Sequence, residues 1–423
     1  MEPVKHKARR ALRWSEKYFK TDMVYVAKSG FWMTFGQVSA VGLVFVMAIV
    51  FANFLPKEVY GKYKFILSAV AILGGLSLTG LGSVVIQAVA QGKEGVLKDA
   101  IRTSMRWGIV PFSVALVLAG YYFFSGNNEL GFAMIIGGIC TPIVNAYGLY
   151  GGLFSGRKDF FRSTMYAMVS QAVNTVLLLV VAVFVYNALV LVAVTFISSV
   201  LVTIGLYNHA MNRHKPNDVR DPSMIEYGKH ISYMNFLGVV ANQLDKILVF
   251  HWLGAVELAV YSFAIAIPEQ VKGSFKNLFG IALPKMSVLH SEQLRASVID
   301  KFLRLTFITA GIAAVYYVAA PYIYLILFPK YLESVWYSQV YMLGLVTIPG
   351  IALFSTYFQV RRETAILYKL SVAGNVVTII YSAFLIYSFG LAGAVIENGA
   401  SWLTMLLING YYFAKDGRKR ASE

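Results

Sequence analysis

Long apolar stretches, each able to cross a lipid bilayer, recur along the whole of this 423-residue sequence. A helix needs about 20 mostly apolar residues to span a hydrocarbon core about 30 Å thick. Hydrophobic residues make up 58% of the chain and charged residues 14%, against about 45–50% and about 25% in soluble proteins. So little polar surface excludes a string of soluble domains, and the many apolar residues exclude disorder. The twelve predicted spans are residues 30–54, 63–90, 108–124, 131–155, 164–186, 188–208, 230–253, 258–283, 303–327, 338–359, 367–388 and 391–413.

The connections between these spans are short, so none is large enough to form a soluble domain. The single cysteine, Cys140, excludes an intrachain disulfide framework. The sequence therefore predicts an all-α polytopic membrane protein with about 12 transmembrane helices. The glycine-rich run 73–83 lacks the lysine of a phosphate-binding loop. We interpret it as a site of close helix packing or a bending point.

The charges are distributed unevenly over the connections. Lys and Arg number 37 against 21 for Asp and Glu, a formal net charge of +16. With the N-terminus in the cytoplasm, 30 cations fall on the cytoplasmic side, and three lie within spans. Short basic loops stay in the cytoplasm, so both termini are predicted to be cytoplasmic, in the inner membrane. Topology therefore explains the net charge without a nucleic-acid partner. The four cations expected outside are Lys57, Lys62, Lys64 and Lys330.

A polar, proline-containing link after the sixth span divides the chain into two halves. A faint internal repeat supports this division, because residues 51–71 align with 249–269 and Tyr63 then matches Tyr261. The basic segment 1–29 is either an amphipathic helix on the anionic inner leaflet or a solvated tail. The predicted domains are 1–29, a six-helix bundle over 30–208, a cytoplasmic linker over 209–229, a second six-helix bundle over 230–413, and a cytoplasmic tail over 414–423.

Several segments resemble one family of membrane transporters. They are LPKEVYGKYKF (55–65), SGRKDFFRST (155–164), NQLDKILVFHWLGAVELAVYSFA (242–264), RRETAILYKLSVAGNVVTII (361–380) and FGLAGAVIENGAS (389–401). Together they are similar to the Wzx-type polysaccharide-biosynthesis flippases of the multidrug/oligosaccharidyl-lipid/polysaccharide (MOP) exporter superfamily. The resemblance implies two pseudo-symmetric six-helix bundles around a central cavity, as in the related multidrug and toxin extrusion (MATE) transporters. It also implies translocation of a polyprenyl-diphosphate-linked oligosaccharide to the outer leaflet by alternating access.

Charged residues inside the spans are candidates for cavity-facing groups, because a charge in hydrocarbon costs about 2.5–3.5 kcal/mol on insertion scales. The seventh span contains Asp245 and Lys246. Adjacent helical residues point about 100° apart, so we expect at least one of them to have a partner elsewhere. Asp245 is either a proton or cation carrier for coupling or one member of a structural ion pair. Lys246 is a candidate for binding the substrate headgroup.

The eighth span carries Glu269, Lys272 and Lys276 on one helical face. A stripe with two cations suits a diphosphate that enters from the cytoplasm, and Glu269 would neutralise Lys272 until the substrate displaces it. Lys276 either joins this stripe or extends to the membrane interface. In the twelfth span, Glu397 either lines the outer vestibule or caps a neighbouring helix.

The first half has amide side chains instead of charges within its spans. Such amides commonly join helices, but Asn145 and Gln171 are also candidates for contacts with sugar hydroxyls. Arg157, Lys158 and Arg162 cluster at the predicted cytoplasmic mouth. They enforce topology and could also attract the diphosphate.

These patterns favour a transporter over an enzyme, since no catalytic acid/base pair and no metal-ligand cluster is evident and the external loops are short. The alternative is a MATE-like exporter of drugs or organic cations, which would need acidic residues in an aromatic pocket. We expect no cofactor, and coupling to a proton gradient, a sodium gradient or the membrane potential. The expected partners are the lipid-linked glycan, membrane lipids and glycan-assembly proteins.

Overall fold

The structure is a computed structural model that describes residues 23–286 and 291–421, with the side chains of 30–274, except Met33, and of 293–416. Most of the basic segment 1–29 lies outside these residues, so both interpretations of it stay predictions. Every regular element in the described part of the chain is a helix. The elements are α2 (Met23–Phe54), α3 (Lys57–Gly75), α4 (Leu81–Ala90), α5 (Val96–Trp107), α6 (Ile109–Phe124), α7 (Asn128–Gly148), α8 (Gly151–Gly156), α9 (Phe160–Phe184), α10 (Ala188–His214), α11 (Pro222–Trp252), α12 (Ala255–Met286), α13 (Ser291–Leu327), η1 (Pro329–Tyr331), α14 (Ser334–Gly344), η2 (Leu345–Thr347), α15 (Ile348–Val360) and α16 (Thr364–Ala421).

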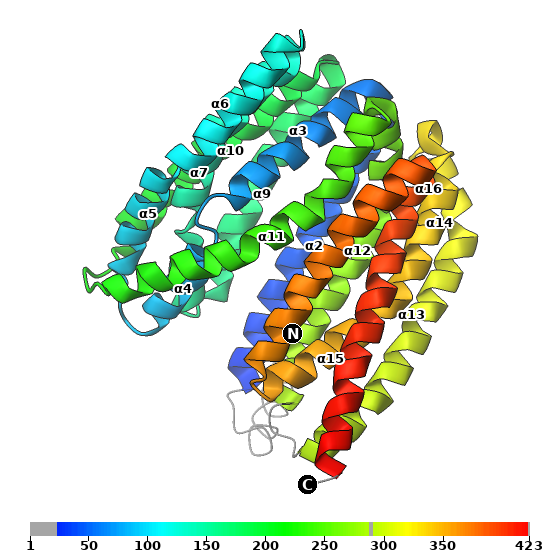
Figure 1. Ribbon diagram of the computed structural model, residues 1–423. Helices are drawn as coiled ribbons and strands as arrows, with labels where there is room; N and C mark the ends of the chain where they lie inside the picture. Colours follow the sequence, from blue (N-terminus) through cyan, green and yellow to red (C-terminus); the bar gives the residue numbers. More distant parts are fainter. Residues whose placement is uncertain (1–22, 287–290, 422–423) are drawn as a thin grey trace, which may run out of the picture.

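The number of membrane passes agrees with the sequence. Eight helical stretches of the described chain are long and apolar enough to cross a membrane. The last of them, Thr364–Asp416, turns back at Gly390, where φ is 59°, and so makes two passes (Figure 1). Three further passes are made by α3 with α4, by α11 and by α12, which correspond to the predicted spans 63–90, 230–253 and 258–283. The predicted all-helical fold with about twelve transmembrane helices is confirmed.

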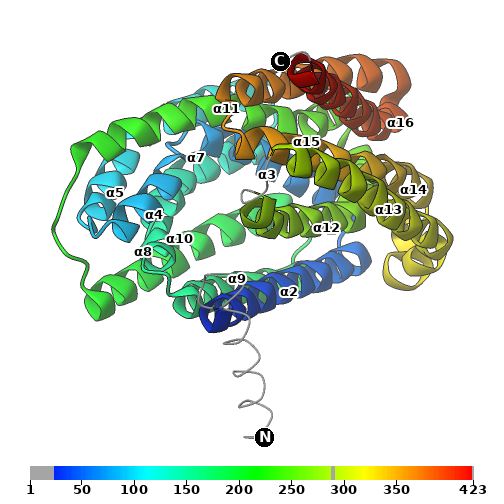
Figure 2. The same cartoon turned by 90° about the horizontal axis from the view of Figure 1, so that it is seen from below.

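The helices form two bundles, which we call the N-half (α2–α10) and the C-half (α11–α16) (Figure 1). Figure 2 shows the bundles from below, where α2 of the N-half and α12 of the C-half lie side by side. The helix α2 starts, and α16 ends, at one end of the molecule, which we call the termini end. The opposite end carries the turns between α2 and α3 and between α11 and α12, and we call it the turn end.

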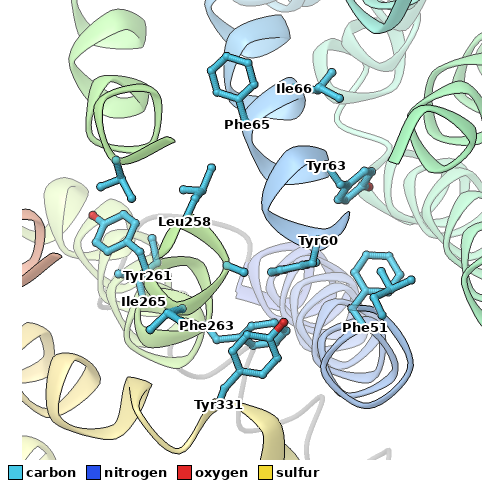
Figure 3. Packing of buried hydrophobic residues seen from close by; sticks show 14 of the residues in the cluster. Phe51, Tyr60, Tyr63, Phe65, Ile66, Leu258, Tyr261, Phe263, Ile265 and Tyr331 are labelled. Atoms are coloured by element: carbon cyan, nitrogen blue, oxygen red, sulfur yellow. The ribbon is translucent and has the colours of Figure 1, made fainter. Parts of the chain in front are cut away.

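At the turn end the two halves are in direct contact. A methyl group added at Gly61 of α3 would lie 1.7 Å from the carbonyl oxygen of Ala255, so only glycine permits this approach of α3 to α12. Aromatic rings fill the space on either side of this contact. Tyr60 stacks on Phe263 with ring centroids 4.6 Å apart (Figure 3). Close van der Waals packing of this kind holds helices together in lipid, where the hydrophobic effect contributes little free energy to helix association.

At the termini end, a loop of the N-half binds the linker that leads into α11. The carboxylate of Glu94 accepts hydrogen bonds of 2.6 and 2.7 Å from the Arg157 guanidinium, and one of 2.9 Å from the backbone N–H of Asn217. Arg157 also donates to the carbonyl oxygen of His214. The Arg157 guanidinium holds the pKa of Glu94 below its usual value. Glu94, Arg157 and Asn217 thus join three chain segments, and we call this group the linker clamp.

Two ion pairs extend the linker clamp. Lys93 Nζ lies 2.7 Å from Asp221 Oδ2, and Lys98 Nζ lies 2.7 Å from Asp218 Oδ1. Hydrogen bonds from Lys93 and Ser223 lower the pKa of Asp221 to about 2, and Lys98 lowers the pKa of Asp218. Asp221 also caps α11, because its side chain accepts from the Ser223 N–H. The start of α11 is therefore fixed to the N-half.

The helix α11 crosses from one half to the other. Near its start it packs on α4 and α5, and further along it packs on α16. The glycine-rich run allows the first contact, because a methyl group at Gly80 would lie 2.5 Å from the carbonyl oxygen of Gly228. Gly80 N–H also donates to Ser232 Oγ at 2.9 Å. The chain breaks here between α3 and α4, so both predicted roles of the run, close packing and bending, are confirmed.

Candidate substrate cavity

A cavity of about 460 Å³ lies between the two halves. The N-half contributes α2 and α3 to its wall, and the C-half contributes α11, α12, α14 and α16. Both halves contribute aromatic rings and charged side chains to this wall, and the C-half also contributes amides. Its polar and aromatic lining residues are Phe51, Tyr60, Tyr63, Lys64, Asn242, Gln243, Asp245, Lys246, Ser262, Glu269, Gln270, Lys272, Tyr341, Thr378, Glu397, Asn398, Ser401 and Trp402.

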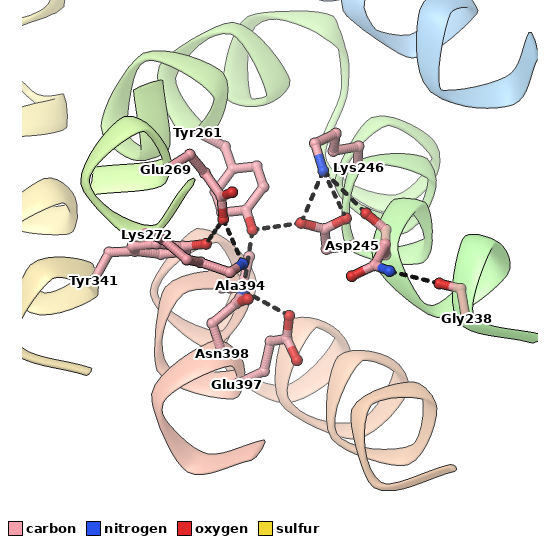
Figure 4. A network of polar contacts seen from close by, with 11 residues as sticks. Gly238, Asp245, Lys246, Tyr261, Glu269, Lys272, Tyr341, Ala394, Glu397 and Asn398 are labelled. Carbon is pink, nitrogen blue, oxygen red and sulfur yellow. Dashed lines mark hydrogen bonds and ion pairs between the residues drawn. The ribbon is translucent and has the colours of Figure 1, made fainter. Parts of the chain in front are cut away.

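Asp245 and Lys246 meet on the α11 side of the cavity (Figure 4). Lys246 Nζ lies 3.2 Å from Asp245 Oδ1, and it also donates to the carbonyl oxygen of Asn242 at 3.3 Å. The adjacent residues also pair with each other, although they point about 100° apart, because the long lysine chain folds back along α11. The expected partner elsewhere exists, since Tyr261 Oη donates to Asp245 Oδ2 at 2.6 Å.

Glu269 and Lys272 form the predicted pair on α12. Lys272 Nζ lies 2.8 Å from Glu269 Oε1, and the Tyr341 hydroxyl donates to the same oxygen. Lys272 Nζ also lies 4.9 Å from the ring centroid of Trp402. Both charges line the cavity, as the sequence predicted. The side chain of Lys276, the third member of the predicted stripe, lies outside the described residues.

Glu397 lies in the second part of α16 and is 1% exposed. It lines the central cavity, with Oε1 accepting a hydrogen bond of 2.7 Å from Asn398 Nδ2. Asn398 Nδ2 also donates to the Tyr261 hydroxyl, which links Glu397 to Asp245 (Figure 4). Neither predicted position, the outer vestibule or a helix cap, describes this site, because α16 turns the carboxylate into the space between the halves.

Lys64 is a cavity residue that the sequence reasoning missed. Its position near the start of α3 suggested an external lysine, but α3 is angled so that Lys64 lines the cavity beside Tyr60, whose ring centroid lies 5.5 Å from Nζ. Lys64 makes no ion pair with any described residue. The internal repeat held a signal, since aligning Tyr63 with Tyr261 places Lys64 opposite Ser262, another lining residue.

The two amides singled out in the N-half lie elsewhere. Gln171 Nε2 donates to the carbonyl oxygen of Ala40 at 3.1 Å and so joins α9 to α2. Asn145 lines a second, mainly apolar cavity of about 380 Å³, whose wall is formed by the N-half and by Val239 of α11. Leu67 belongs to the wall of both cavities, so the two spaces are neighbours.

The basic cluster of the predicted mouth lies at the termini end and is largely neutralised. Arg157 belongs to the linker clamp, and Arg162 pairs with Asp159 at 2.7 Å. Lys158 is exposed, with a φ of 60° just after α8. Of the three, Lys158 is the cation without an ion pair to a described residue. Arg157 therefore has a structural role that the sequence did not predict.

A family model described as "Polysaccharide biosynthesis protein" matches residues 26–290, more than half of the chain. The chain belongs to this family. The match covers the N-half from residue 26 onward together with α11, α12 and all three cavity lysines. The resemblance inferred from the sequence motifs is therefore confirmed. No curated protein sequence matches the chain significantly.

Solved structures of MOP transporters share the fold of this family member. The lipid II flippase MurJ, in an inward closed conformation, superimposes with a TM-score of 0.69 at 11% identity, over 91% of this chain and 87% of that chain. An inward-facing multidrug resistance MATE transporter gives 0.65 at 15% identity, over 89% and 94%. A MOP superfamily transporter from Pyrococcus furiosus gives 0.61 at 14% identity, over 92% and 96%. At these identities the similarity establishes the fold.

Proposed function

We propose that this polysaccharide-biosynthesis family member is a flippase, a transporter rather than an enzyme. It moves a polyprenyl-diphosphate-linked oligosaccharide, such as a repeat unit of a surface polysaccharide, from the cytoplasmic to the outer leaflet. The observation that carries the proposal is the cavity, which presents lysines from both halves to one space. A diphosphate linking a lipid to a glycan is the part of such a substrate that needs cations in a membrane.

The three cavity lysines support a diphosphate site in different ways. Lys246 and Lys272 are held in place by Asp245 and Glu269, at 3.2 and 2.8 Å. Lys64 faces them from α3 without an acidic partner among the described residues. A diphosphate between the halves would gain charge-assisted hydrogen bonds from both walls, which are stronger than neutral ones.

Alternating access accounts for the movement of this substrate. The halves touch at the turn end through Gly61 and Ala255, which supports an inward-facing state if the termini end is cytoplasmic. That orientation follows the excess of cations at the termini end, in an inner membrane. The glycan would cross through the cavity while the polyprenyl chain stays among membrane lipids. Glycan-assembly proteins are the partners that would supply the substrate and take it up after transport.

Coupling is proposed to act through the carboxylates of the C-half. Asp245 and Glu397 are joined through Tyr261 and Asn398, inside the wall that must change shape during transport. A proton or a sodium ion on this group would neutralise it, and the membrane potential would act on the net charge of the cavity. Loss of transport in Asp245→Asn under a proton gradient alone, with transport under the other drivers kept, would assign coupling to protons.

The test is translocation of a fluorescent polyprenyl-diphosphate-linked oligosaccharide in proteoliposomes. Lys272→Ala and Lys64→Ala each remove one charge-assisted contact and should slow translocation about tenfold or more. Lys415→Ala is the matched control, because Lys415 is exposed near the end of α16, and it should leave the rate unchanged. Equal rates in the wild type and both cavity variants would remove the lysines from the site, and no translocation by the wild type would refute the flippase.

An exporter of organic cations is the second candidate. Three carboxylates and the rings of Tyr341 and Trp402 line the same cavity, which favours a cation at that wall. Against it, Asp245 and Glu269 are each paired with a lysine, and the lining residues of the N-half include no carboxylate. Uptake of ethidium by the same proteoliposomes, without translocation of the lipid-linked glycan, would establish this second function.

A further inference from the structure

Trp402 is a tryptophan of the cavity wall whose ring is held in one orientation. The Tyr341 ring meets it edge-on, with centroids 5.1 Å apart and an interplanar angle of 88°. Gly344 also packs against the indole and leaves just enough room for it, because a methyl group there would lie 3.2 Å from Cε3 and Cζ3. The ring therefore has little freedom to turn, and it lines the cavity.

One face of the Trp402 ring is covered by the ammonium group of Lys272, which also forms an ion pair. Lys272 Nζ lies 4.9 Å from the Trp402 ring centroid while it pairs with Glu269. The ammonium is attracted by the negative face of the indole. A diphosphate that drew Lys272 toward itself would therefore uncover the face of Trp402.

Two buried hydroxyl groups of the same wall have no hydrogen-bond partner among the described residues. Ser262 Oγ and Ser401 Oγ make no hydrogen bond to any described residue, although the two residues are 5% and 2% exposed. Both line the cavity, and Ser401 directly precedes Trp402 in α16. A buried hydroxyl without a partner is costly, so a ligand that offers hydroxyl groups would satisfy both.

We infer that Trp402, with Ser262 and Ser401, forms a binding site for the sugar that is attached directly to the diphosphate. The C–H bonds on the flat side of a pyranose carry partial positive charge and stack on the negative face of an indole. The position follows from covalent geometry, because the first sugar is bonded to the phosphate that Lys272 would hold. This inference rests on the proposed flippase function and adds selection of the first sugar to it.

The experiment measures the contribution of the sugar to binding. Farnesyl diphosphate and its glucosyl, galactosyl and N-acetylglucosaminyl derivatives, each sugar carried on the terminal phosphate, are titrated into the protein in nanodiscs by calorimetry. At least one sugar-bearing probe should bind the wild type about tenfold more tightly than farnesyl diphosphate. In Trp402→Leu this difference should fall to about twofold, while the affinity for farnesyl diphosphate stays within about twofold.

Three further variants separate stacking from structural effects. Trp402→Phe keeps an aromatic face and should retain part of the difference, and Ser401→Ala should reduce it without touching the ring. Trp336→Leu is the matched control, because Trp336 is 51% exposed on α14 and does not line the cavity. It should leave every affinity unchanged.

The outcomes distinguish this inference from the function on which it rests. If farnesyl diphosphate binds the wild type but no sugar improves the affinity, the sugar site is refuted and the diphosphate site stands. A loss of affinity in Trp402→Leu that is equal for all probes would also refute it, because Trp402 would then act only by positioning Lys272. If no diphosphate binds the wild type, the proposed function itself fails.

Discussion

The N-half of this protein is joined to the rest of the chain by different means at the turn end and at the termini end. At the turn end, α3 and α12 approach so closely that Gly61 touches the backbone of Ala255, and aromatic rings such as Tyr60 and Phe263 pack beside them. At the termini end, the linker clamp joins loop and linker through charged hydrogen bonds centred on Glu94. The first contact depends on shape, and the second depends on charge.

Under the proposed alternating access, this difference separates a contact that has to open during transport from a connection that has to persist. Van der Waals packing between complementary surfaces is lost as soon as they part by a fraction of an ångström, so it suits a gate. The linker clamp binds residues of the linker to the N-half and fixes the start of α11 there. The two ion pairs that extend it, Lys93–Asp221 and Lys98–Asp218, are partly exposed, so salt and acid should weaken them, whereas the turn end should be insensitive to both.

The largest effect is expected at Gly61. Gly61→Leu places a side chain where the Ala255 carbonyl oxygen lies, so the turn end cannot close. Overpacking of this kind costs about 1–3 kcal/mol, and translocation should fall about tenfold or more. A cysteine at Ser262, in a Cys140→Ser background, should become reactive to a reagent added on the turn-end side.

Gly120→Leu in α6 is the control, since a methyl group at Gly120 would meet nothing within 4 Å. It should transport normally and leave the cysteine at Ser262 protected. A Gly61→Leu variant that behaved like this control would show that the turn end is not a gate.

The linker clamp should contribute stability more than transport rate. Glu94→Ala leaves the Arg157 guanidinium and the Asn217 N–H without their acceptor, at a cost of about 1–3 kcal/mol. We expect the Tm in detergent to fall by about 2–4 °C. Glu226→Ala is the matched control, because Glu226 is an exposed partner of Lys229, and its Tm should change by less than about 1 °C. A Tm equal to that of the wild type in Glu94→Ala would contradict the role of the clamp.

Acid should weaken the linker clamp over a pH range that the pKa values of its carboxylates define. Its carboxylates have lowered pKa values in the folded protein, about 2 for Asp221. Their contribution is therefore complete above the unfolded pKa of about 4 and is lost as the pH falls toward about 2. Asp221→Asn keeps the helix cap and removes the charge. The Tm difference between this variant and the wild type should be constant above about pH 5 and shrink below about pH 4. A difference that grew on acidification would overturn this assignment.

The smallest effect is expected from an ion pair at the turn end. Lys57 of α3 pairs with Glu333 of the C-half, and these side chains are 31% and 52% exposed. Exposed pairs contribute about 0–1 kcal/mol. Lys57→Ala should therefore change neither Tm nor translocation measurably at physiological salt. A loss of transport as large as in Gly61→Leu would mean that charge, rather than shape, closes this end.

Some of the predicted site residues are positioned by the geometry of a single helix, and others by the way several helices pack. Glu269 and Lys272 lie three residues apart on one helix, so helical geometry alone brought them together. Asp245 and Glu397 were identified as costly charges in apolar spans, but their link through Tyr261 and Asn398 joins three helices. Lys64 was misjudged because the tilt and neighbours of a helix are absent from its own sequence, whereas Gln171 joins α9 to α2, as amides in membrane helices commonly do.

The sequence by itself determined that this chain is a bundle of about twelve membrane helices in two halves, and its motifs pointed to the family. Those properties depend on apolar runs of about 20 residues, on the side of the membrane that cations occupy, and on local motifs. Only the tertiary structure decided that Lys64, Lys272 and Trp402 share one cavity. These residues come from α3, α12 and α16, and their distances are set by how the helices pack, including the approach that a single glycine at position 61 allows.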